Sequence, residues 1–254
     1  MKKILALGFI LVLSACAQQG GAPQQLTLEQ ADARHSARVH TELAAGYYSR
    51  VQYGIALEEL NRALSADPNY APAYNMLGLV YMELRDDAKA QQNFERALGI
   101  NPNDSEAHNN FGWFLCTRNR IDESIPHFLK AVTNPLYVSP EKAYFNAGIC
   151  ALKKGDDAAA KDYLAKALAR QPLMPQALYQ MAVLHFKQGQ YPDAKILLTR
   201  YAQIATATPD SLWLSVRVER KLGDKESEAS YALQLRKAFP DSPQTKLLLG
   251  GRYE

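Results

Sequence analysis

Histidines, cysteines and paired carboxylates are the side chains that most often carry out chemistry, and in this sequence they are scattered. The five histidines are His35, His40, His108, His127 and His185, and none has the spacing of a metal-binding motif. Acidic pairs such as Glu58 with Glu59 lie on expected helix surfaces, where solvated carboxylates are commoner than an acid–base pair. No glycine loop that would bind phosphate or support a nucleophilic serine occurs. The sequence therefore predicts a protein that is not an enzyme, with no metal site and no cofactor.

Cys16 is the cysteine whose neighbours predict a covalent modification. Two lysines near the start precede an apolar run at 4–13 and two small residues at 14–15. This order is typical of a secretory signal, which is too short to span a membrane as a mature helix. The stretch Leu-Ser-Ala-Cys at 13–16 resembles the lipobox of bacterial lipoproteins. The resemblance implies that 1–15 are a lipoprotein signal peptide and that Cys16 is acylated; the alternative is an ordinary signal peptide in which Cys16 is incidental.

Acylation would make Cys16 a permanent membrane anchor. Three acyl chains bury dozens of methylene groups at about 0.8 kcal/mol each, far more than the marginal hold of a single chain. Ala17 stands where lipoproteins of the inner membrane often carry aspartate, so the resemblance favours the outer membrane. After the acylated cysteine, the rest of 16–26 is rich in glycine and glutamine, which predicts a flexible linker.

The formal charge of +3 at pH 7 argues against one large class of partners. Binding of nucleic acid depends on many Lys and Arg contacts to phosphate, and the basic residues here form no cluster. No second apolar run has the length of a membrane span. We therefore expect neither a nucleic-acid partner nor a small-molecule substrate, and a membrane attachment that rests on Cys16 alone.

The elements that would position any binding residues recur with a period of 34 residues. The unit that begins at Ala71 carries Tyr74, Leu77, Gly78, Tyr81, Ala90, Phe94, Ala97 and Pro102. These residues match, place for place, the pattern of the tetratricopeptide repeat, in which two helices form a hairpin. Small residues fall where the two helices cross closely, and the proline ends the second helix.

The same frame fits six units, which begin near residues 37, 71, 105, 141, 175 and 210. In the last unit Arg217 replaces the small residue of the pattern, as is expected of a degenerate terminal repeat. Thr27 and Gln30 predict a capping box that opens a long first helix. The sequence thus predicts an all-α, right-handed superhelical solenoid of about six repeats at 27–243, followed by a C-terminal tail at 244–254.

A repeat solenoid offers a partner an extended concave surface. In tetratricopeptide folds the first helix of each repeat lines this groove, as the resemblance implies. The groove residues predicted for this chain are Tyr48, Asn75, Leu79, Met82, Asn109, Trp113, Phe145 and Asn146. Asparagine amides can both donate to and accept from a peptide backbone, while aromatic and methionine side chains serve as interface anchors. For Leu79 the alternative is packing between repeats. Because the basic residues of carboxylate-binding relatives are largely missing, we expect an apolar or internal peptide segment as the partner.

Cys116 and Cys150 fall on the first helices of the third and fourth repeats. Measured from the glycine of each repeat, their positions differ by two residues, or about 200° of helix rotation. One side chain would then face forward and the other back, as a bridge between neighbouring helices requires. A disulfide also needs alpha carbons within about 7 Å of each other. The oxidising compartment implied by a secretory signal favours the disulfide, and the alternative is a pair of small buried hydrophobic residues.

The C-terminal block carries a more specific resemblance than the repeats do. Its Ser-Leu-Trp at 211–213, Leu-Gly-Asp at 222–224 and Phe-Pro-Asp-Ser at 239–242 are similar to the terminal signature of the type IV pilus biogenesis lipoproteins, the PilF/PilW pilotin family. The lipobox, the short linker and the six repeats resemble that family as well.

This resemblance implies an outer-membrane lipoprotein on the periplasmic face that binds the secretin subunit of the type IV pilus and promotes its localisation and multimerisation. The mechanism would be recruitment, because a membrane anchor raises the local concentration of the bound subunit. The alternative is a tetratricopeptide lipoprotein that serves as an adaptor for another envelope machine, such as β-barrel outer-membrane protein assembly. Tyr48, Leu79, Met82 and Trp113 are the expected apolar anchors for the partner.

Overall fold

Helices make up the regular structure of residues 27–253, the part of the chain that the computed structural model describes, and no strand occurs in that part. The helices are α1 (Leu28–Ser49), α2 (Tyr53–Ala66), α3 (Ala71–Glu83), α4 (Asp87–Ile100), α5 (Ser105–Thr117), α6 (Ile121–Ala131), α7 (Pro140–Lys154), α8 (Asp157–Arg170), α9 (Pro175–Lys187), α10 (Tyr191–Ile204), α11 (Pro209–Leu222), α12 (Lys225–Ala238) and α13 (Pro243–Leu249). The prediction of an all-α fold is confirmed.

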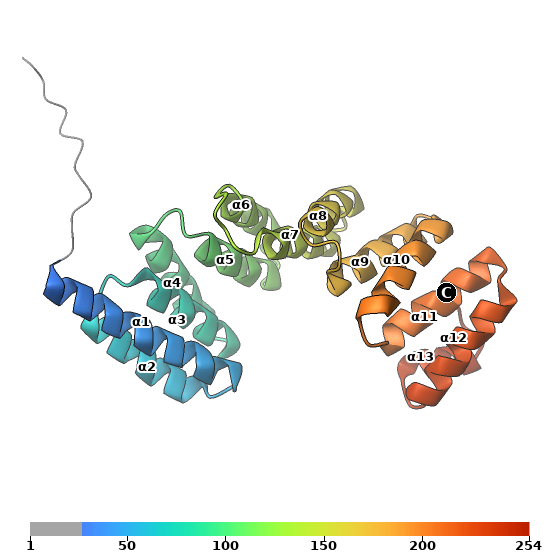
Figure 1. Cartoon of the computed structure of the whole chain (residues 1–254), viewed down its shortest axis with the longest axis horizontal. Helices are drawn as coiled ribbons and strands as arrows, with labels where there is room; N and C mark the ends of the chain where they lie inside the picture. The colour runs from blue at the N-terminus through green and yellow to red at the C-terminus, as the bar shows by residue number, and fades with distance from the viewer. Residues whose placement is uncertain (1–26, 254) are drawn as a thin grey trace, which may run out of the picture.

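Consecutive helices pair as hairpins. α1 packs against α2 and α3 against α4, and the pairing continues to α11 with α12. The first helices of neighbouring hairpins also touch, as α3 does with α5 and α5 with α7. The hairpins, repeats one to six in chain order, therefore form a row with α13 packed at its end (Figure 1). Each repeat buries its apolar face against the next, which is how a solenoid builds a continuous core.

Capping residues set where the helices begin. Thr27 and Gln30 form the predicted capping box, each side chain accepting from the backbone N–H of the other, and α1 follows directly at Leu28. Aspartate side chains accept backbone N–H bonds at the starts of α4, α5, α8 and α12. Proline lies in the first turn of α3, α7, α9, α10, α11 and α13, where its missing N–H costs no hydrogen bond.

Within a hairpin, a glycine on the first helix allows a large side chain of the second helix to approach closely. A Cβ atom built on Gly78 would lie 2.6 Å from the ring of Phe94, which is fully buried. A Cβ atom built on Gly112 would lie 2.9 Å from the ring of Phe128, and one built on Gly148 would lie 2.9 Å from the side chain of Leu164. These contacts explain why the small residue of the repeat pattern is glycine in repeats two to four.

The turn between the two helices of each repeat contains one residue in the left-handed region. In repeats four to six this residue is glycine, at Gly155, Gly189 and Gly223. In repeats one to three the equivalent residues are Val51, Arg85 and Asn119, with φ of 63°, 60° and 62°. Residues other than glycine rarely adopt this backbone conformation, and for a β-branched valine it is strained. The first three turns therefore carry side chains at a place where the last three carry none.

The residues that we expected to form a tail include most of α13. Ser242 caps this helix, and the Thr245 hydroxyl donates to the carbonyl oxygen of Phe239 at 2.7 Å from a buried position. After the helix, the ring of Tyr253 stacks on Trp213 of α11 with their centroids 5.6 Å apart. Leu247, Leu248 and Tyr253 give this segment an apolar face that packs on repeat six.

Candidate peptide-binding surface

The eight predicted groove residues lie on the first helices of repeats one to four. Tyr48 is on α1; Asn75, Leu79 and Met82 are on α3; Asn109 and Trp113 are on α5; Phe145 and Asn146 are on α7. Six of the eight are partly exposed, whereas Asn75 and Asn109 are only 8% and 6% exposed. The structure brings some of these side chains together and separates others.

The asparagines form a chain of hydrogen bonds across three helices. Asn146 Nδ2 donates to Asn109 Oδ1 at 3.0 Å, and Asn109 Nδ2 donates to Asn110 Oδ1 at 3.4 Å. Asn110 Nδ2 then donates to Asn75 Oδ1 at 3.2 Å. This asparagine chain (Asn75, Asn110, Asn109 and Asn146) ties α3, α5 and α7 to one another, so much of its hydrogen-bonding capacity is used within the protein. The partly exposed Asn110 and Asn146 keep amide groups that a peptide backbone could bond.

Met82 and Trp113 line one cavity between repeats two and three. Its volume is about 540 Å³. The other lining residues are Glu83, Arg85, Asp87, Thr117 and Arg118, which lie at the ends of α3 and α5, in the turns after them and at the start of α4. The cavity thus combines two apolar walls with a charged rim.

The charged rim is held by an ion pair between repeats. Arg118 Nε donates to both carboxylate oxygens of Asp87 at 2.8 Å, and Arg118 Nη2 donates to the Met82 carbonyl oxygen at 3.3 Å. The hydrogen bonds from Arg118 hold the pKa of Asp87 below its usual value. This rim was not among the residues predicted from the sequence. The period offers a signal for part of it, since Glu83 and Thr117 stand one 34-residue unit apart at the ends of α3 and α5.

Tyr48 extends this surface toward repeat one. Its hydroxyl donates to Glu83 Oε1 at 3.4 Å, and its ring lies 5.7 Å from that of Tyr53. Burial, reinforced by the negative charge of Glu83, raises the pKa of Tyr48 to about 12. The phenol is therefore a neutral donor at physiological pH, and Glu83 links it to the rim of the cavity.

Two of the predicted groove residues take part mainly in packing. Leu79 contacts the buried clusters of both repeat two and repeat three, which is the alternative that the sequence left open for it. Phe145 packs against the large buried cluster that extends from α7 to α11. Met82 and Trp113 thus line one cavity together, and Tyr48 reaches its rim through the hydrogen bond to Glu83.

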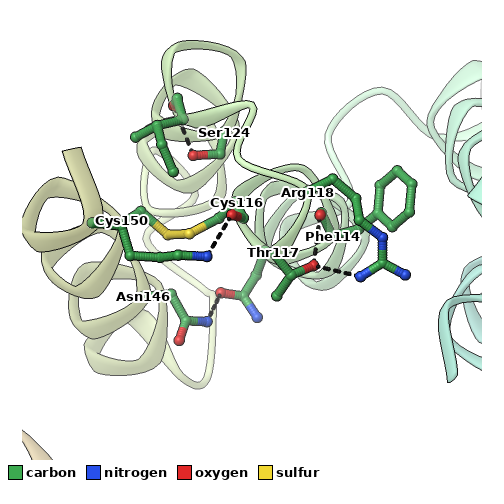
Figure 2. Close-up of a disulfide and its surroundings, with 10 residues drawn as sticks. Phe114, Cys116, Thr117, Arg118, Ser124, Asn146 and Cys150 are labelled. Atoms are coloured by element: carbon green, nitrogen blue, oxygen red, sulfur yellow. Dashed lines mark hydrogen bonds between the residues drawn. A yellow bond between two sulfur atoms is a disulfide. The ribbon is translucent and has the colours of Figure 1, made fainter.

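The structure contains a disulfide between Cys116 and Cys150, with their alpha carbons 5.8 Å apart (Figure 2). Both residues are fully buried, in a cluster against which Trp113 also packs. Lys153 Nζ donates to the carbonyl oxygen of Cys116 at 3.0 Å. The disulfide fixes α5 against α7, close to the hydrogen bond between Asn146 and Asn109 (Figure 2). Helices α5 and α7 are therefore linked by both a covalent bond and a hydrogen bond.

Histidines pair with neighbouring side chains within the repeats. His108 Nδ1 and His127 Nδ1 are 2.9 Å apart, and the ring of Phe111 packs edge-on against His127. His40 Nδ1 lies 2.6 Å from Glu59 Oε2, and Arg62 Nη1 donates to the other carboxylate oxygen, Oε1. Within residues 27–253, no three His, Cys, Asp or Glu side chains are grouped as metal ligands. Cys16, the predicted lipidation site, lies outside the described residues.

Comparison with known proteins identifies the repeats and a set of relatives. Residues 71–104, 117–175 and 151–216 match family models described as tetratricopeptide repeat. The type IV pilus assembly protein PilF of Pseudomonas aeruginosa is 30% identical over 240 residues, which are 93% of this chain and 94% of PilF.

Two solved structures agree with this relationship over most of their length. The crystal structure of PilW, described as a widely conserved type IV pilus biogenesis factor, is 34% identical with a TM-score of 0.75, and the match covers 84% of this chain and 98% of PilW. The structure of Pseudomonas aeruginosa PilF gives a TM-score of 0.80 at 27% identity, covering 87% of this chain and 99% of that one. This homology supports a role in type IV pilus biogenesis. The chain belongs to the PilF/PilW family of tetratricopeptide-repeat proteins of type IV pilus biogenesis.

Proposed function

We propose that this protein is an outer-membrane lipoprotein facing the periplasm, where it binds the secretin subunit of the type IV pilus and promotes its localisation and multimerisation. Its membership of a pilus biogenesis family supports a partner from the same machine. The observation that carries the proposal is the cavity that Met82 and Trp113 line together. A secretin segment would bind there.

The chemistry of this cavity suits an internal peptide segment with an apolar side chain. Its volume of about 540 Å³ falls within the range of cavities that hold small ligands or buried side chains. Tryptophan is enriched among the residues that dominate binding energy, and methionine adapts its shape to a partner. The rim carries both signs of charge, from Glu83 and Asp87 and from Arg85 and Arg118, so it has no strong preference for a terminal carboxylate.

Membrane attachment is assigned to the acyl group on Cys16. No helix among residues 27–253 has the length and apolarity needed to cross a bilayer. Confining the binding surface to a membrane turns the search for the secretin into one along that surface, which raises the effective concentration of bound subunits without any new contact. Multimerisation is concentration-dependent and would be promoted in this way.

The first test deletes the gene and follows secretin multimers in outer-membrane fractions after mild heating and electrophoresis. Deletion should leave mostly monomeric secretin and abolish twitching, and the wild-type gene should restore both. A Cys16→Ser variant should fold normally but fail to place secretin in the outer membrane. Normal multimers in the deletion strain would contradict the proposal. Loss of β-barrel outer-membrane proteins with secretin multimers intact would instead assign the chain to β-barrel assembly.

The second test separates the groove from the anchor. A Trp113→Ala variant, and separately Met82→Ala, should weaken binding to purified secretin about tenfold or more, because each removes an anchor from the cavity. Leu136→Ala is the matched control, since Leu136 is 84% exposed in the loop after α6. Thermal melts by circular dichroism establish that each variant is folded. Equal affinity of the Trp113 variant and the Leu136 control would rule out this surface as the secretin site.

A further inference from the structure

Two adjoining cavities lie where repeats five and six and the C-terminal residues meet. Helices α9 and α11, which contribute to them, are at the opposite end of the row from α1 (Figure 1). One, of about 670 Å³, has aromatic walls from α9 and α11, including Tyr179, Phe186 and Trp213. The other, of about 810 Å³, lies between α11 and the residues that follow α13. Arg217, Lys221 and Tyr253 line both of them. These cavities therefore form one continuous cleft, the C-terminal cleft.

Arg217 is held in the middle of this cleft. Its Nε donates to the carbonyl oxygen of Tyr253 at 2.9 Å, and its guanidinium lies 4.4 Å from the centre of the Phe186 ring. Neither Nη of Arg217 donates a hydrogen bond to a residue in the described part of the chain. The guanidinium of Arg220 lies 3.9 Å from the centre of the Tyr253 ring. The fork of Arg217 is thus fixed in direction while its two outer nitrogens are left to bond a ligand.

Among residues 27–253, the lining of the cleft carries more positive than negative charge. Its cationic lining residues are Lys187, Arg217, Arg220, Lys221 and Arg252, and its acidic lining residue is Asp210. Lys187 and Arg220 have carboxylates nearby, from Asp157 at 3.7 Å and Glu228 at 3.0 Å. For Arg217, Lys221 and Arg252, no carboxylate of residues 27–253 lies within 4.0 Å. Three like charges beside low-dielectric aromatic walls repel one another, so an anionic ligand would relieve an unfavourable arrangement.

We propose that the C-terminal cleft binds an acidic peptide segment that carries an aromatic or apolar residue beside its carboxylates. The guanidinium fork of Arg217 matches a carboxylate, which it can bond through two parallel hydrogen bonds. The ring-lined cavity next to it accommodates an apolar side chain, as aromatic-walled pockets at interfaces commonly do. A concave site lined from three sides suits a peptide better than a flat lipid surface. This site lies beyond the proposed secretin groove and does not depend on it.

The test measures fluorescence anisotropy of labelled peptides titrated with the purified protein. The probes are a short peptide of alternating glutamate and phenylalanine and its glutamine analogue. The glutamate peptide should bind, its affinity should fall as the salt concentration rises, and the glutamine analogue should bind at least about tenfold more weakly. Equal binding of the two peptides would overturn the proposal.

Two matched double variants locate the site. Lys221→Glu with Arg252→Glu should weaken binding of the glutamate peptide about tenfold or more, and both side chains are exposed, so the fold should persist. Lys130→Glu with Lys142→Glu makes the same change of charge at exposed residues of α6 and α7 and should leave the affinity unchanged. Arg217→Lys keeps the charge but loses the fork, and it should cost several-fold in affinity.

Equal affinity of the two double variants would place binding elsewhere and overturn the proposal. A membrane partner is distinguished with vesicles of phosphatidylglycerol and phosphatidylcholine. Binding to these vesicles through Lys221 and Arg252, without binding of the glutamate peptide, would assign the cleft to anionic lipid and also overturn the proposal.

Discussion

At the scale of single residues, the packing of a helix hairpin lowers the pKa values of His127 and His108. Burial, reinforced by the nearby His108 and partly opposed by Glu123, lowers the pKa of His127 to about 4. Burial also lowers the pKa of His108. A proton shared between the two Nδ1 atoms, 2.9 Å apart, satisfies both rings, whereas protonating both rings would set two donors against each other. Both histidines are therefore neutral at pH 7.

The expected consequence is a loss of stability in mild acid. The unfolded chain, in which histidine has a pKa of 6.5, binds protons before the folded chain does. The free energy of unfolding should therefore fall as the pH falls from about 6.5 to about 4, by about 1–2 kcal/mol once partial exposure is taken into account. Urea denaturation at pH 7 and pH 5 measures this change. His127→Gln should reduce the difference between the two pH values, and His35→Gln, at an exposed residue, should not.

The sequence predicted part of this arrangement. The period places His108 and His127 in the two helices of the third repeat, and the structure brings their rings together within that hairpin. The contact itself depends on the rotamers of two side chains nineteen positions apart, and a periodic pattern carries no information about rotamers.

At the scale of elements, the helix hairpins followed from the period, but the strained turns did not. Helices α3, α5 and α9 begin at the predicted starts 71, 105 and 175, and α7 and α11 begin one residue early. By contrast, nothing in the local sequence predicts a left-handed valine at Val51, because that conformation opposes the intrinsic preference of the residue. The packing of α1 on α2 imposes it.

Relieving this strain should stabilise the first repeat. Val51→Gly removes the steric conflict at φ 63°, and the expected rise in the free energy of unfolding is about 1 kcal/mol after the greater flexibility of glycine in the unfolded chain is included. Val138→Gly is the control, because Val138 is an exposed residue between α6 and α7 without a positive φ, and there the change should give no gain. Chemical denaturation compares the two variants, and an equal effect would contradict the strain argument.

At the scale of the whole molecule, the period predicted the order of the helices and the row of first helices that carries the groove. It could not separate groove residues from packing residues, since Leu79 and Met82 lie one helical turn apart and differ only in what the neighbouring repeat places beside them. Nor could it predict the C-terminal cleft. Arg217 was noticed only as a departure from the pattern, and the stacking of Tyr253 on Trp213 depends on the fold of the last residues.

The disulfide should contribute strongly to the stability of the middle of the solenoid. It closes a segment of 34 residues, and constraining a loop of that length in the unfolded chain is worth about 3–4 kcal/mol. Cys116→Ala with Cys150→Ala should therefore lower the denaturation midpoint, and backbone amides of α5 to α7 should exchange hydrogen faster than those of α9 and α10. Chemical reduction of the wild-type protein is the control and should give the same midpoint as the double variant. Identical midpoints for the oxidised and reduced wild-type protein would contradict this prediction.

The asparagine chain has a polarity. Every link runs from Nδ2 to Oδ1 in the same sense, so the row ends in an acceptor at Asn146 and in a donor at Asn75. An amide can exchange these roles only by turning over, and its neighbours then lose their partners, at about 1–3 kcal/mol for a buried group, unless they turn as well. The four amides would therefore reverse together. A ligand that presents a hydrogen-bond donor instead of an acceptor at one end of the row would then determine whether the other end, two repeats away, offers a donor or an acceptor. The groove would therefore distinguish the direction of a bound peptide chain as well as its side chains.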